Sequence, residues 1–272
     1  MRNFSVAEGN YRVTITFGNA ASPTGITVKA ELRRLMFESV RTEPGQTVRR
    51  TFIVNVRRPQ IAGGGEVHLK EREKNSELAE WDNQLSLEFL GPAPGIQAVE
   101  FAQAAREPTL FIAGDSTVTD QPLEPYASWG QMITRFFGPE IAVANQSEYG
   151  ESLTSFIAEN RLAKLVSVMR PGDFLLVRMG HNDQKLKADG AGPWTTYTAQ
   201  LKQFVTAARE QGASSILVTS PQRRTFDTDG KIVNSLGEFP NAVRQVARDM
   251  KVPLIDLHAA SKTFHDALGP EQ

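Results

Sequence analysis

Along the first part of the chain, hydrophobic and polar side chains alternate with a period of two. The alternating segments are 11–17, 26–32, 51–56, 67–70, 85–90 and 96–101. Successive side chains of a strand point to opposite faces, so each segment predicts a strand with one buried face. Turn signals such as Pro44-Gly45 and Gly63-Gly64-Gly65 separate them. Short strands at this spacing predict an antiparallel β-sandwich, which we place in residues 1–104.

A different pattern begins at Leu110, where short apolar runs alternate with longer segments of helical period. The runs predict strands over 110–113, 141–144, 173–177, 214–218 and 252–256. Helices are expected over 129–137, 153–169, 195–211, 238–250 and 259–268. Continuous apolar strands that alternate with helices predict an α/β domain with a doubly wound parallel sheet. This domain is expected to cover 109–272, with a short linker before it.

The composition is that of a globular protein with a substantial core. Of the 272 residues, 40% are hydrophobic and 22% are charged. The net charge of -1 favours neither nucleic acid nor a membrane surface as the partner. The absence of cysteine excludes disulfides, thiolate catalysis and cysteine-ligated zinc. Only four histidines are present besides (68, 181, 258 and 265), which limits the options for a metal site and for a general base.

Both ends of the sequence predict an incomplete protein. The chain opens almost inside its first strand, and Met1-Arg2-Asn3-Phe4 does not begin a signal peptide. It stops at Gly269-Pro270-Glu271-Gln272, where Gly-Pro starts a loop after the last predicted helix. A five-stranded doubly wound sheet normally has a further helix over its face. We therefore expect the sandwich to be incomplete at its N-terminus and the α/β domain at its C-terminus.

Three predicted strand ends carry residues suited to acyl transfer. Ser116 follows the first strand, Gly150 lies beyond the second, and Asn182 lies beyond the third. The carboxyl ends of parallel strands meet at one edge of the sheet, where α/β proteins bind ligands. A serine hydroxyl can act as nucleophile, while an unobstructed glycine N–H and an asparagine amide can stabilise an oxyanion. We therefore expect these three residues to form one site.

Each of these residues also has a purely structural interpretation. Ser116 and Thr117 are common caps of a following helix. Gly150 fits a turn or a helix start, and the segment Gly180-His181-Asn182-Asp183 fits a loop of capping residues. The functional interpretation depends on all three residues lying, in chain order, beyond the ends of successive strands.

The same residues carry a family resemblance. Gly114-Asp115-Ser116-Thr117, the lone Gly150 and Gly180-His181-Asn182-Asp183 resemble the first three sequence blocks of the SGNH (GDSL-type) hydrolases. Within them, Asn145 to Phe156 and Thr219-Ser220-Pro221 are similar to bacterial rhamnogalacturonan acetylesterases. The resemblance covers about residues 109–272 and implies a flavodoxin-like sheet. The segment before it is similar to the β-sandwich that precedes the esterase domain in many bacterial members.

The resemblance implies a role for each matching residue. Ser116 would be the nucleophile, and its own N–H, the N–H of Gly150 and the side chain of Asn182 would form the oxyanion hole. Asp115 would shape the turn without transferring a proton. His181 is expected at the rim of the pocket.

The family's catalytic base is a histidine in an Asp-x-x-His motif beyond the fifth strand. This motif is not present in the 272 residues, so the Asp/His dyad is missing. His258, in Asp256-Leu257-His258, is the nearest substitute, but it lies before the position that the family uses. Without a base Ser116 is a weak nucleophile, and the chain as given is expected to have low activity.

The resemblance favours a serine esterase that removes acetyl groups from rhamnogalacturonan or a similar plant polysaccharide, in the periplasm or outside the cell. Trp194 and Tyr197 follow the third strand and are expected to stack on a sugar. A xylan or general acetylesterase is an alternative within the superfamily. A carbohydrate-binding protein with a degenerate, noncatalytic SGNH domain is an alternative of another class.

Overall fold

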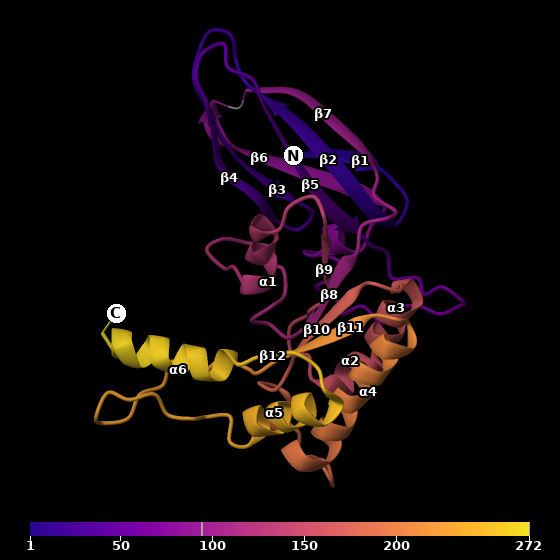
Figure 1. Cartoon of the computed structure of the whole chain (residues 1–272), viewed down its shortest axis with the longest axis vertical. Coiled ribbons are helices and arrows are strands. Elements are labelled where there is room, and N and C mark those ends of the chain that lie inside the picture. Colours follow the sequence, from indigo (N-terminus) through magenta and orange to yellow (C-terminus); the bar gives the residue numbers. More distant parts are fainter. Residues whose placement is uncertain (94, 272) are drawn as a thin grey trace. The chain divides into compact units, whose positions relative to one another are not determined.

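The computed structural model describes residues 1–93 and 95–271 (Figure 1). These residues form two compact units. One unit is Met1–Leu110 with Thr117–Gln146, and the other is Phe111–Ser116 with Ser147–Gln272. Among the described residues, no helix combines the length and the apolar character needed to cross a membrane.

The first unit contains the predicted antiparallel β-sandwich. Its strands are β1 (Arg2–Ser5), β2 (Gly9–Phe17), β3 (Thr24–Ala30), β4 (Arg34–Thr42), β5 (Val48–Val56), β6 (Gln84–Ala93) and β7 (Ile96–Gln103). They make two sheets, of order β1-β6-β3-β4 and β5-β2-β7. The alternating residues Val13, Ile15 and Phe17 of β2 are fully buried, and they pack with Val28 and Leu87 of the other sheet in one hydrophobic core.

Two details of the sandwich differ from the prediction. Residues 67–70 are not a strand, and their segment is irregular apart from an isolated bridge between Gln60 and Glu66 and a short 3-10 helix, η1 (Leu78–Glu80). Strand β4 was not expected. Its register against β3 shifts twice, and Ser39 has a φ of 53°. These bulges interrupt the period-two alternation by which a strand is recognised in sequence.

The first unit also includes residues that follow the nucleophile candidate in the chain. They form α1 (Trp129–Met132), the 3-10 helix η2 (Ile133–Phe136) and β9 (Ala142–Asn145). Gln131 donates a hydrogen bond to the carbonyl of Leu32 at 2.9 Å, and Thr134 donates one to that of Leu35 at 2.6 Å. Through these bonds Thr117–Gln146 is grouped with the sandwich in the first unit.

A buried network of charged groups joins these parts of the first unit. Arg34 and Asp120, both fully buried, form an ion pair at 2.5 Å. Asn145 donates to the other oxygen of Asp120 and to the carbonyl of Val118, each at 2.7 Å. Arg57 in turn donates to the carbonyl of Asn145 at 2.5 Å. Two arginines of the sandwich thus anchor the loop that follows Ser116 in sequence.

The predicted doubly wound sheet is confirmed. Its strands are β8 (Thr109–Gly114), β9, β10 (Phe174–Arg178), β11 (Ser214–Val218) and β12 (Leu254–Ile255), in the order β12-β11-β10-β8-β9. In chain order this is the 2-1-3-4-5 arrangement of flavodoxin-like folds. The pairs β10–β11 and β11–β12 are parallel. Each connection passes through a helix, as parallel strands require.

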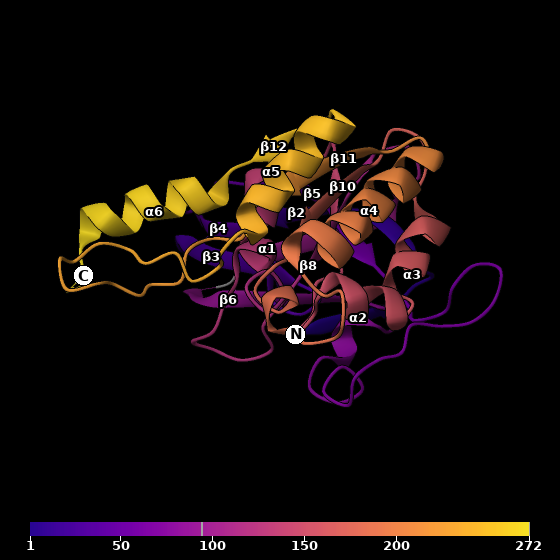
Figure 2. The same cartoon turned by 90° about the horizontal axis from the view of Figure 1, so that it is seen from below.

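The helices of the second unit lie close to the predicted ranges. They are α2 (Leu153–Ala158), α3 (Arg161–Val168), α4 (Thr198–Glu210), α5 (Phe239–Met250) and α6 (Leu257–Leu268), with the short turns η3 (Asp183–Lys185) and η4 (Pro193–Tyr197). The helix expected over 153–169 is broken at Asn160, which has a φ of 61°. Helices α4 and α5 pack against each other and on β11 (Figure 2).

Candidate active site

Ser116 lies in the turn directly after β8. All six residues of β8 are buried, so the strand is fixed in the sheet up to Gly114. Ser116 and Thr117 are half-buried in the turn. The backbone N–H of Glu148 donates to the carbonyl of Gly114 at 3.2 Å. This bond joins the end of β8 to the segment that contains Gly150.

Beneath the turn, Asp115, Arg178 and His181 form a buried polar cluster. Asp115 and Arg178 are fully buried and form an ion pair through Nη1 of the arginine. Arg178 also directs Nη2 to Nδ1 of His181, at 2.8 Å. Nε2 of His181 lies 3.1 Å from the carbonyl oxygen of Pro221. The sequence placed His181 at the pocket rim, whereas the structure places it in this cluster.

The contacts of His181 define its protonation state. A carbonyl only accepts and a guanidinium only donates, so Nε2 carries the hydrogen and Nδ1 is an acceptor. The carboxylate of Asp115 is 3.8 Å from Nδ1, beyond hydrogen-bond distance. Burial, together with the nearby charge of Arg178, lowers the pKa of His181 to about 4. The imidazole is therefore neutral at pH 7, and the lone pair on its Nδ1 accepts a hydrogen bond from Arg178.

The structure brings the two predicted oxyanion-hole segments together. Nδ2 of Asn182 donates to the carbonyl of Glu151 at 2.9 Å, and Nζ of Lys185 donates to Oδ1 of Asn182 at 2.8 Å. Gly150 is exposed, and its φ of +75° is a left-handed conformation that favours glycine. A Cβ added there would meet nothing within 4 Å. The preference for glycine at this position therefore comes from the backbone conformation and not from close packing.

Asp183 also links the segment of Asn182 to the segment that follows Gly150. Its Oδ1 accepts the backbone N–H of Leu153, at the N-terminus of α2, at 2.8 Å. Its Oδ2 is buried and has no hydrogen-bond partner among the described atoms. Burial raises the pKa of Asp183 to about 7 despite the bond from Leu153. The sequence predicts for Asp183 only a place in a loop of capping residues.

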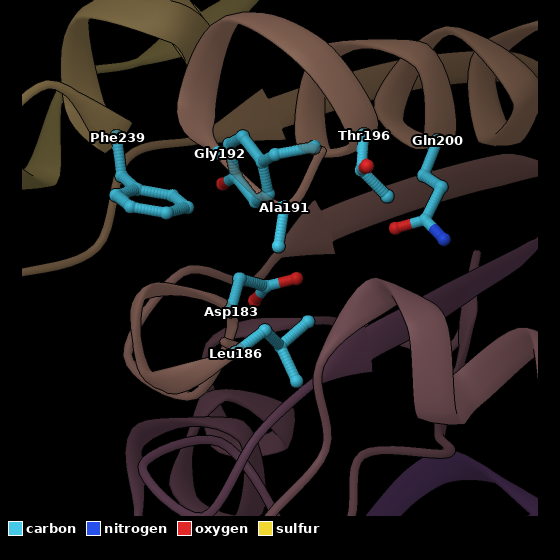
Figure 3. Close-up of a pocket in the computed structure, with 8 residues that line it drawn as sticks. Asp183, Leu186, Ala191, Gly192, Thr196, Gln200 and Phe239 are labelled. Carbon is cyan, nitrogen blue, oxygen red and sulfur yellow. The ribbon is translucent and has the colours of Figure 1, made fainter. Parts of the chain in front are cut away.

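A small pocket lies beside Asp183 (Figure 3). It is lined by Asp183, Leu186, Ala191, Gly192, Thr196, Tyr197, Gln200 and Phe239. Its volume of about 10 Å³ corresponds to roughly one water molecule, so it is too small for a sugar.

The two aromatic residues predicted to bind sugar occupy different environments. Trp194 is 51% exposed and presents a free ring surface. Tyr197 is only 3% exposed, packs edge-on against Phe239 and donates its hydroxyl to the carbonyl of Met179 at 2.8 Å. The prediction for Tyr197 is therefore corrected, because a ring packed in the core cannot stack on a sugar.

The chain also resembles known proteins over its second part. A model of the GDSL-like lipase/acylhydrolase family matches residues 112–271. The chain belongs to this family. The matched range contains Ser116, Gly150 and Asn182, and the predicted family resemblance is confirmed.

Several relatives of this GDSL-like chain have names that describe an activity. Rhamnogalacturonan acetylesterase RhgT of Bacillus subtilis (strain 168) is 43% identical over 165 residues, which are 60% of this chain and 70% of the relative. The probable rhamnogalacturonan acetylesterase YesY of the same organism is 37% identical over 166 residues, 60% of this chain and 76% of the relative. These relatives support an esterase.

One solved structure matches nearly the whole chain. The crystal structure of YxiM from Bacillus subtilis has a TM-score of 0.56 and 22% identity, and the match covers 99% of this chain and 70% of that chain. This likeness shows the fold, with the strand-rich segment and the parallel sheet in one polypeptide.

His258 was the nearest substitute for the missing catalytic base of this GDSL-like chain. At the start of α6, Nε2 of His258 lies 3.3 Å from Oδ1 of Asn234, and Nδ1 lies 3.5 Å from Nη2 of Arg244. The pKa of His258 is lowered by burial and by Arg244. Asp256 does not pair with the ring, because Arg244 holds it with two bonds of 2.9 Å. His258 is thus part of a structural cluster at the start of the helix.

Proposed function

We propose that this protein is a carbohydrate acetylesterase that removes acetyl groups from rhamnogalacturonan through an acetyl-serine intermediate at Ser116. The observation that carries the proposal is the 43% identity with a rhamnogalacturonan acetylesterase over 165 residues. The position of Ser116 at the end of a fully buried strand, with Gly150 and Asn182 on two segments that are bonded to each other, supports the same chemistry.

In the proposed reaction, Oγ of Ser116 attacks the carbonyl carbon of the acetyl group. The negative charge on the carbonyl oxygen is stabilised by the N–H groups of Ser116 and Gly150 and by Nδ2 of Asn182. The bond from the acetyl carbon to the sugar oxygen breaks, this oxygen takes up the proton lost by the serine hydroxyl, and the acetyl group stays on the serine. Water then attacks the acetyl-serine and releases acetate. No step requires a metal or a cofactor.

We assign the catalytic base to neither His181 nor His258. The lone pair of His181 accepts a hydrogen bond from Arg178, and His258 belongs to the cluster of Arg244 and Asn234. The Asp-x-x-His motif that provides the base in the resemblance does not occur in these 272 residues. Without an assigned base, Ser116 should be acylated slowly and should keep its acetyl group for longer than the serine of a complete triad.

Trp194 is the proposed contact for the sugar rings. It is exposed at the start of η4, in the segment that follows the loop of Asn182. An indole face binds the apolar face of a pyranose ring and leaves the substrate hydroxyls in water. Because a polysaccharide cannot enter a cell intact, we propose that the protein acts in the periplasm or outside the cell, on pectic material.

Acetate release tests the proposal. The chain is mixed, in excess over acetyl groups, with acetylated rhamnogalacturonan oligosaccharides or with acetylated xylo-oligosaccharides. We expect faster release from the rhamnogalacturonan substrate and none above background with Ser116→Ala. Faster release from xylo-oligosaccharides would indicate a xylan esterase. Binding of the oligosaccharides without any release would indicate a noncatalytic carbohydrate-binding protein.

A further inference from the structure

The orientation of the Asn182 side chain decides whether it can stabilise an oxyanion. An amide has a donating nitrogen and an accepting oxygen, and rotation by half a turn exchanges them. Only the nitrogen can stabilise a negative oxygen, whereas the carbonyl oxygen would repel it. A neighbouring group that holds the amide in the orientation with its nitrogen toward the oxyanion therefore contributes to catalysis without touching the substrate.

Two neighbours of this amide both select the same orientation. Oδ1 of Asn182 accepts from Nζ of Lys185 at 2.8 Å, while Nδ2 donates to the carbonyl of Glu151 at 2.9 Å. An ammonium group only donates and a carbonyl only accepts. After a half-turn, the nitrogen would face the ammonium and the oxygen would face the carbonyl, so both bonds would be lost.

The local backbone explains why Lys185 reaches this position. Residues 183–185 form the 3-10 helix η3, and the N–H of Lys185 donates to the carbonyl of Asn182 at 2.9 Å. In a 3-10 helix, side chains three residues apart lie over each other. Lys185 is therefore carried to the side of Asn182 by the turn itself.

We propose that Lys185 is a positioning residue of the oxyanion hole, which fixes the amide of Asn182 with its nitrogen toward the substrate and polarises it. The inference rests on the proposed role of Asn182 in acyl transfer. One hydrogen of Nδ2 is bound by Glu151, and the second remains to be offered to the oxyanion. The ammonium charge withdraws electrons from the amide, which strengthens that second donor.

The test uses three variants and p-nitrophenyl acetate, a small neutral ester. Lys185→Met removes the bond and the charge, Lys185→Arg keeps both, and Lys187→Met removes an exposed charge two residues away. The rate of p-nitrophenol release in the first turnover is measured, because it does not depend on deacylation. We expect Lys185→Met to be slower by about fivefold at saturating ester, as for the loss of one solvent-exposed hydrogen bond, with KM unchanged. Lys185→Arg should recover most of the rate, and Lys187→Met should equal the original chain.

Two results would overturn the proposal. One is an unchanged first-turnover rate in Lys185→Met. The other is a raised KM for acidic oligosaccharides with no change on p-nitrophenyl acetate, which would make Lys185 a substrate contact. The rhamnogalacturonan proposal fails separately, through absent acetate release by the original chain, and the small-ester experiment remains informative in that case.

Discussion

Nη2 of Arg178 lies 2.8 Å from Nδ1 of His181, so the histidine directly before Asn182 accepts a hydrogen bond from a buried cation. The other ring nitrogen faces the carbonyl of Pro221. In this geometry His181 is not suited to act as a general base, because its lone pair already accepts a hydrogen bond and its pKa is lowered to about 4. The residue instead connects the loop of Asn182 to the buried Asp115–Arg178 pair.

Replacement of His181 tests this assignment. His181→Gln keeps a polar side chain of similar reach and should lower the acylation rate by less than about tenfold. Loss of a general base typically costs about 10² to 10⁴ in rate. The first-turnover rate on p-nitrophenyl acetate is the measurement. A loss of about a thousandfold, with the fold intact by circular dichroism, would instead identify His181 as the base.

Asp183 should make stability depend on pH. Its pKa rises on folding from an ordinary value of 3.8 to about 7, so the folded state binds this proton more tightly than the unfolded state. The contribution to stability is complete below pH 4 and is lost as the pH rises through about 7. Asp183→Asn keeps an acceptor for Leu153 and cannot ionise. The variant should therefore gain stability relative to the original chain by up to about 1.4 kcal/mol per pH unit between pH 4 and 7.

Urea unfolding of the two proteins at several values from pH 5 to pH 8 provides this comparison. The difference between the two free energies of unfolding cancels the titration of other groups, such as the buried Glu31, whose pKa is raised to about 8. Parallel curves for the two proteins would show that the Asp183 carboxyl does not titrate in this range.

Substitutions of Trp194 and Tyr197 should have different effects. Trp194→Ala should weaken the binding of acetylated oligosaccharides by about tenfold and leave p-nitrophenyl acetate unaffected, because the exposed ring can contact only a larger substrate. Tyr197→Phe should lose about 1 kcal/mol of stability with its bond to Met179 and leave both substrates unaffected. Equilibrium binding and thermal unfolding check these outcomes. A change in oligosaccharide binding in Tyr197→Phe alone would reverse the assignment.

The buried ion pair of the first unit should contribute strongly to stability. Arg34→Met leaves Asp120 buried without its cation and should destabilise the chain by about 3 to 5 kcal/mol. The matched control is Arg49→Met, whose partner Glu100 is 62% exposed. That change should cost less than about 1 kcal/mol because water screens the pair. Similar effects of the two substitutions in denaturant unfolding would contradict the proposed role of the buried network.

The strands of the parallel sheet could be predicted because each is a continuous apolar run with a polar end. The range 214–218 agrees with β11 residue for residue, and the end of β8 places Ser116 where the sequence predicted it. The motif residues at the other strand ends were found by the same rule. Such predictions depend only on local burial and on the geometry shared by all parallel sheets.

Other features depend on contacts that no local pattern reveals. The bulges of β4 break its alternation, and the burial of Tyr197 depends on Phe239, which lies far along the chain. The pairing of Arg178 with Asp115 joins two strand ends. A charged residue at the end of an apolar strand was the only signal for it. The bond of Lys185 to Asn182 could have been anticipated only with knowledge of the 3-10 turn.

The most direct test of the account is the intact mass of the chain after it is mixed with p-nitrophenyl acetate and quenched in acid. We predict the addition of one acetyl group, located at Ser116 by peptide mapping, and no addition to Ser116→Ala. Acetylation at another residue, or p-nitrophenol release by Ser116→Ala at the original rate, would contradict the assignment of Ser116 as the nucleophile.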